Sequence, residues 1–249
     1  MKYLKYAGGV AVLAYLSMVA QVTSGSYLRQ AQVTESEGKI HVMANSPRPL
    51  EQMLNALDQK YKWGVNYEDP RFTSKFDLVE DKDAQVKVLP GGGQFSVEFP
   101  TDMQEENILK LIVDSYNASN NPGRFELKKN EQGDFSVVGS QARNLHGQLA
   151  RQSALFDARI TIPAQQRSVS DTLNLICRKV AAQQHVAITM GVSPRNLLNN
   201  TDVTVHGTQT SARDLLLQAL ASTRRRLYWR LLYDPGTKGY SFNVHLIPA

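Results

Sequence analysis

A chain of 249 residues that is 42% hydrophobic and 20% charged can bury one or two real cores, which excludes wholesale disorder. Its formal net charge of +5 is only mildly basic, so charge alone does not require a nucleic-acid partner. The single cysteine, Cys177, excludes an intrachain disulfide, and packing alone must therefore hold the fold together.

The first residues have the layout of a secretory signal peptide. Lys2 and Lys5 form a positive start, residues 6–22 carry no charge, and small residues follow at 23–26. This pattern predicts a signal peptide over residues 1–26 and a periplasmic or secreted protein. An uncleaved anchor remains an alternative, because an apolar run of about 17 residues lies at the lower limit for crossing a bilayer. Contact with a membrane is expected only if this segment is retained.

Residues 38–140 predict a first α+β module. A strand at 39–43 precedes an amphipathic helix that opens at Ser46 or Pro47, and a short strand follows at 65–67. After an irregular charged stretch at 68–93, an alternating strand leads to a second helix. Asp102 is its expected cap, with Glu105 three residues later. A hairpin at 124–127 and 135–138 closes the module.

Residues 157–248 predict a second module with the same order of elements. A strand at 159–162 precedes a helix that Ser168 caps, with Asp171 three residues on. The remaining expected elements are strands at 185–189 and 202–205, a helix from Thr210 or Ser211, and a hairpin at 227–233 and 240–246. Residues 139–156 are polar and predict a linker, with a short connecting helix, that few contacts cross.

The duplicated pattern predicts the fold class. Each copy has two helices that can cover one face of a mixed, mainly antiparallel sheet. We therefore expect an α+β chain of two tandem small modules.

Five segments of the second copy carry a resemblance to a known family. They are residues 158–166, 169–173, 186–188, 203–208 and 212–220, followed by the hairpin. In order and pattern they resemble the short N-terminal domain shared by bacterial secretins and TonB-dependent receptors, and the first copy matches more loosely. The resemblance implies a periplasmic, non-catalytic module that docks on other envelope proteins. No pore domain or outer-membrane barrel follows in this sequence, so the partner stays open and a transport function is not expected.

No set of residues predicts catalysis. The five histidines stand singly without the spacing of zinc ligands, and no G-x-S-x-G nucleophile motif is present. Gly91–Gly93 lacks the lysine and hydroxyl residue of a phosphate-binding loop. We therefore expect no enzyme activity, no metal and no cofactor.

A basic and aromatic cluster is the strongest polar feature. The plainest interpretation is that its arginines solvate a corner between a helix and a strand. The functional interpretation is a docking patch for an anionic surface or a protein. Single-stranded nucleic acid can bind such clusters, but no G-x-x-G loop of a KH domain joins two helices here, so we do not expect it. The cluster consists of Arg213, Arg224, Arg225, Arg226 and Arg230.

The sequence thus predicts an exported, non-enzymatic protein–protein interaction module of the bacterial cell envelope, an accessory to a secretion or transport assembly. The alternative is an envelope enzyme or polymer-binding protein whose site lies between the two modules. Such a site would need a cleft lined by convergent polar groups.

Overall fold

The computed structural model describes residues 30–81, 86–90 and 94–247. The predicted signal peptide lies outside the described residues. Within them, none of the helices has the length and apolar character needed to cross a membrane. The chain has an α+β fold with several mixed, mainly antiparallel sheets, as the sequence predicted.

The first half of the chain builds two helices and a small antiparallel sheet. The sheet order is β1-β2-β6, and β1 was not predicted. The second helix starts later than expected, since its N-cap is Gln104 rather than Asp102, and neither residue supplies a side-chain cap. A β4–β5 pair lies in the stretch predicted to be irregular. The elements are β1 Gln32–Ser36, β2 Lys39–Ala44, α1 Pro49–Tyr61, β4 Val79–Asp81, β5 Val86–Val88, β6 Phe95–Pro100 and α2 Glu105–Ala118.

The second half begins with a short 3₁₀ turn and contains three α-helices. Ser168 caps α3 as predicted, because its hydroxyl accepts a hydrogen bond from the Asp171 amide at 3.0 Å. The short helix α4 and the strand β14 were not predicted. The elements are η1 Leu155–Asp157, β10 Arg159–Ile162, β11 Arg167–Ser168, α3 Val169–Gln184, α4 Arg195–Asn199, β13 Asp202–Val203, β14 Gly207–Ser211 and α5 Ala212–Ala221.

A seven-stranded sheet runs through both halves. Its order is β12-β16-β15-β3-β8-β7, and β9 pairs with β8. The halves meet where β3 pairs in parallel with β15, with Tyr67 opposite Arg230 and Glu68 opposite Leu231. The strands are β3 Asn66–Glu68, β7 Arg124–Lys129, β8 Phe135–Arg143, β9 Leu149–Arg151, β12 Ala187–Met190, β15 Leu227–Asp234 and β16 Gly239–Leu246.

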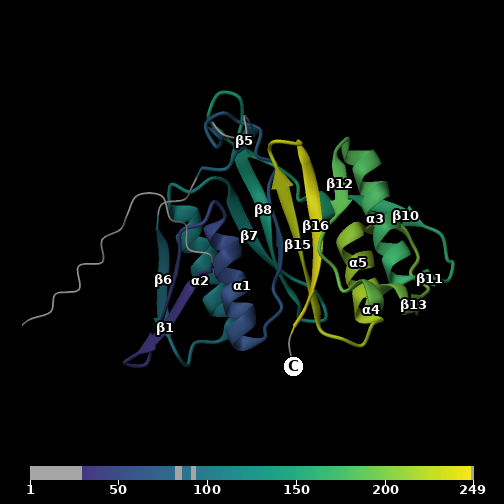
Figure 1. The fold of residues 1–249 in the computed structure, drawn as a ribbon, viewed down its shortest axis with the longest axis horizontal. Helices are drawn as coiled ribbons and strands as arrows, with labels where there is room; N and C mark the ends of the chain where they lie inside the picture. Colours follow the sequence, from purple (N-terminus) through teal and green to yellow (C-terminus); the bar gives the residue numbers. More distant parts are fainter. Residues whose placement is uncertain (1–29, 82–85, 91–93, 248–249) are drawn as a thin grey trace, which may run out of the picture.

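Two hydrophobic cores lie on opposite faces of this shared sheet. One core joins α1 and α2 to β2 and β6 on one side and to Tyr67 and Val137 of the large sheet on the other. The second core packs α3 and α5 against Trp229, Leu231 and Phe242. Figure 1 shows the resulting layers, with α1 and α2 between the small and the large sheet and α3 and α5 beyond the large sheet.

The predicted loose linker is wrong. Strand β8 continues through Arg143, β9 pairs with it, and the only helical turn in this stretch is the 3₁₀ turn η1. Many contacts also join the two halves. They were not predicted, because the sequence pattern of each half shows its own apolar stripes but not the strand edges that pair with the other half.

Candidate docking surface

Three exposed arginines occupy the turn between α5 and β15. The turn is closed by hydrogen bonds from the Thr223 amide to the Leu220 carbonyl and from the Arg224 amide to the Ala221 carbonyl, both 3.1 Å. The Thr223 hydroxyl also accepts a hydrogen bond from the Arg225 amide at 3.2 Å. Arg224, Arg225 and Arg226 are all exposed. The turn thus holds three guanidinium groups at one end of the large sheet.

The end of α1 joins this turn from the other half of the chain. Arg226 donates a hydrogen bond from Nη2 to the Trp63 carbonyl at 3.1 Å. Lys62 ends α1 in the left-handed conformation, with its amide donating to the Asp58 carbonyl at 2.9 Å. Tyr61 and Trp63 are the residues before and after Lys62, and their rings stack with centroids 5.1 Å apart. We call Lys62, Arg224, Arg225 and Arg226 the basic corner.

The charges of the basic corner are largely unneutralised within the described part of the chain. The side chains of Lys62, Arg224 and Arg225 have neither an ion pair nor a hydrogen bond there. Partial burial raises the pKa of Glu105, and the charge of Arg226 acts in the opposite direction. The corner therefore presents a local excess of positive charge to solvent.

The prediction that Arg230 belongs to an exposed patch is wrong. Arg230 is 1% exposed and points from β15 toward α1. Its guanidinium donates to Asp58 Oδ2 at 2.6 Å, to Asn55 Oδ1 at 3.0 Å and to the Val65 carbonyl, and lies 3.6 Å from Glu51 Oε1. Burial raises the pKa of both Glu51 and Asp58, and Arg230 opposes that rise.

Arg213 is likewise buried, at 6% exposure, so its assignment to the patch is also wrong. From α5 its Nη2 donates to Glu68 Oε2 of β3 and to Asp157 Oδ1 of η1, both at 3.0 Å. Burial raises the pKa of Glu68 against the opposing charge of Arg213. Burial acts in the same direction on Asp157, but Lys128 and Arg213 together hold its pKa below the ordinary value.

The two buried ion pairs are reciprocal. Arg230 of the second half pairs with Asp58 of α1, and Glu68 of the first half pairs with Arg213 of α5. Asp69 adds a third junction, because its carboxylate accepts hydrogen bonds from Arg48 at 2.7 Å and from the Tyr233 amide at 2.9 Å. These arginines stabilise the contact between the halves and are not available to an outside partner.

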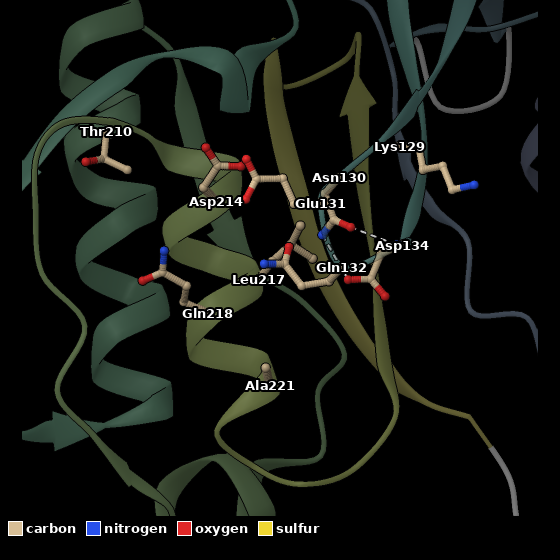
Figure 2. A pocket seen from close by; sticks show the side chains of 10 residues that line it. All are labelled: Lys129, Asn130, Glu131, Gln132, Asp134, Thr210, Asp214, Leu217, Gln218 and Ala221. Atoms are coloured by element: carbon tan, nitrogen blue, oxygen red, sulfur yellow. Dashed lines mark hydrogen bonds between the residues drawn. The ribbon is translucent and has the colours of Figure 1, made fainter.

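A cleft of about 440 Å³ lies between the β7–β8 turn of the first half and α5 of the second. Figure 2 shows the side chains of Glu131 and Asp214 turned toward the same part of this cleft. Asp134 contributes a third carboxylate, which accepts a hydrogen bond from the Asn130 amide group at 2.9 Å. Lys129 also lines the cleft, but it pairs with Glu106 at 2.6 Å. The cleft is therefore acidic.

Other groups weighed in the sequence do not gather into a site in the described residues. That part of the chain has no cluster of three or more histidine, cysteine or acidic side chains suited to a metal. Cys177 is buried on α3, and burial raises the pKa of its thiol to about 12, so it behaves as a small apolar residue. Gly91–Gly93 lies outside the described residues.

Sequence reasoning missed Lys62 and Trp63. They lie about 160 positions before the arginine turn, and nothing in the local pattern joins the two segments. The available signal was compositional, since Lys60-Tyr-Lys-Trp63 mixes basic and aromatic residues as the arginine cluster does.

The comparisons with known proteins found no family model, no curated protein and no solved structure that matches this chain. The resemblance to the secretin and TonB-dependent receptor domain therefore remains a prediction.

Proposed function

We propose that this protein is an exported, non-enzymatic docking module of the bacterial cell envelope. It binds an acidic protein surface through the basic corner, as an accessory to a secretion or transport assembly. One observation carries the proposal: Arg224, Arg225 and Arg226 lie on one turn that is hydrogen-bonded to the end of α1 beside Lys62. The side chains of Lys62, Arg224 and Arg225 have no partner within the described part of the chain.

The physics of the corner suits recognition. Guanidinium groups form paired hydrogen bonds with carboxylates, so neighbouring arginines fit an acidic protein surface better than single lysines do. The turn is closed by backbone hydrogen bonds and by the Thr223 hydroxyl, so its backbone loses little conformational entropy on binding. Exposed charges of this kind mainly steer and orient a partner, and their effect weakens as salt rises.

The alternative, an enzyme or polymer-binding protein with a site between the halves, has the acidic cleft in its favour. A general acid needs a carboxyl whose pKa is raised by burial or by a close like charge. Glu131, Asp134 and Asp214 are all exposed to solvent. The cleft also has no aromatic side chain among the residues that line it within the described chain. The docking interpretation is therefore the better supported one.

Capture of partners from envelope extract tests the proposal. The full chain is compared with a triple variant, Arg224→Gln, Arg225→Gln and Arg226→Gln, at low and at high salt. The matched control removes three other exposed arginines: Arg151→Gln, Arg178→Gln and Arg195→Gln. We expect a protein partner that is retained by the control, lost by the corner variant and released by salt. Equal loss from both variants would show that only net charge matters and would refute docking at the corner.

A further inference from the structure

The basic corner begins at the rim of the acidic cleft. Ala221 is the last residue of α5 and lines the cleft, and its carbonyl accepts the hydrogen bond from the Arg224 amide that closes the arginine turn. Asp214 lies in the first turn of α5 and the arginine turn follows its last residue, so the cleft runs along the helix from the negative surface to the positive one.

The charges on the acidic side are as free as those on the basic side. Within the described residues, the carboxylates of Glu131 and Asp214 have neither an ion pair nor a hydrogen bond. Asp134 is hydrogen-bonded only to its neutral neighbour Asn130 and keeps its charge, while the cation of Lys129 is neutralised by Glu106. The cleft therefore offers three carboxylates, and the arginine turn offers three guanidinium groups.

Adjacent surfaces of opposite charge are self-complementary under a two-fold rotation. If two copies face each other about an axis between the corner and the cleft, each corner meets the cleft of the other copy. Both contacts form at once, so the assembly closes as a dimer.

We propose that the partner which fits the basic corner is a second copy of this chain, bound as a symmetric dimer. The arginines of each copy enter the acidic cleft of the other. This inference rests on the proposed docking role of the corner and names its partner. Leu217 and Ala221 supply apolar surface in the cleft, against which the methylene stems of the arginines pack while their guanidinium groups reach the carboxylates.

Two single charge reversals test the dimer. Arg225→Glu and Glu131→Arg change exposed turn residues whose side chains have no partner in the described part of the chain, so each variant should fold. Either reversal places like charges at both contacts of the dimer. We expect the dimer dissociation constant, measured by sedimentation equilibrium of the full chain in low salt, to rise roughly tenfold or more. The control Arg151→Glu changes net charge by the same amount as Arg225→Glu and should leave the constant within about twofold of wild type.

Mixing the two variants provides the decisive measurement. In a mixed dimer the new carboxylate at position 225 meets the new guanidinium at position 131, and the other contact pairs Arg225 with Glu131 as in wild type. The mixture should therefore recover the dimer that each variant alone has lost. Thermal melts of each variant alone verify that both are folded before mixing.

Four outcomes would overturn the inference. Three of them are a wild-type chain that remains monomeric, single reversals that dimerise as wild type does, and a mixture that fails to recover. The fourth is growth beyond the dimer, because that indicates an open head-to-tail contact. If the chain is monomeric but the corner variant still loses an envelope protein in the capture experiment, the self-association fails and the proposed docking function stands.

Discussion

Replacing Arg230 by methionine tests whether the buried charges hold the two halves together. The guanidinium of Arg230 is the cation that faces Asp58 and Glu51, and it also bonds Asn55 and the Val65 carbonyl. Methionine has a similar stem and fills most of the space, so Arg230→Met removes the charge and its hydrogen bonds with little change in packing.

The cost follows from what the substitution leaves behind. Breaking a buried pair by removing one partner costs about 3–5 kcal/mol, because the remaining charge loses its compensation. The stranded carboxyls can avoid part of this cost by binding a proton. Protonation costs about 1.4 kcal/mol for each pH unit by which the solution pH exceeds the folded-state pKa of the carboxyl, so this cost falls on acidification. We expect a loss of about 3–5 kcal/mol at neutral pH and a smaller loss at mildly acidic pH.

Urea unfolding followed by tryptophan fluorescence and by circular dichroism measures these differences. The exposed control Arg225→Met should change the free energy of unfolding by less than about 0.5 kcal/mol. The double variant Arg230→Met with Asp58→Asn should recover part of the loss, because one of the stranded charges is gone. A loss below about 1 kcal/mol, or a loss that grows on acidification, would show that the buried pair does not join the halves as described.

Three further outcomes are expected. Leu50→Ala and Leu173→Ala should each lower the free energy of unfolding by about 2–5 kcal/mol in urea melts, since both side chains are fully buried, one in each core; losses below about 0.5 kcal/mol at both sites would contradict the core assignment. Burial raises the folded-state pKa of Glu68, so its contribution to stability should fall as pH rises above the ordinary carboxyl range. Glu68→Gln should therefore make the decline of unfolding midpoints with pH shallower, while Glu51 and Asp58, whose pKa values burial also raises, keep part of it. Mass spectrometry of the exported protein should find an N-terminus within residues 22–27, whereas an intact Met1 in the membrane fraction would support an anchor.

The local elements could be predicted well because their signals lie within short windows. The strand at 159–162 and the Ser168 cap have the predicted bounds and chemistry, since alternation and capping depend on neighbouring residues. Strand β1 was missed because its residues are almost all exposed and show no apolar alternation. The short helix α4 buries only Leu198, which leaves no stripe to detect.

The candidate site was predicted only in part, because the sequence does not show which arginines are buried. All five arginines lie within residues 213–230, but the alternation of β15 turns Arg230 inward and the face of α5 turns Arg213 inward. The partners Glu68 and Asp58 lie 145 and 172 residues away, on elements whose apolar stripes include no sign of a buried charge. The shared sheet escaped prediction for the same reason, because a strand's pattern gives its faces and not its neighbour.

The reciprocal ion pairs also determine which residues of β3 and β15 can lie opposite each other. Successive side chains of a strand point to opposite faces, so a slip of β3 by one residue against β15 would turn Glu68 to the face of α1. Glu68 would then face the carboxylates of α1, and Arg213 would lose its buried partner on β3. Only two residue pairs join these strands, too few for backbone hydrogen bonds alone to select one alignment. The buried charges therefore add selectivity for this alignment to the backbone hydrogen bonds of a short seam.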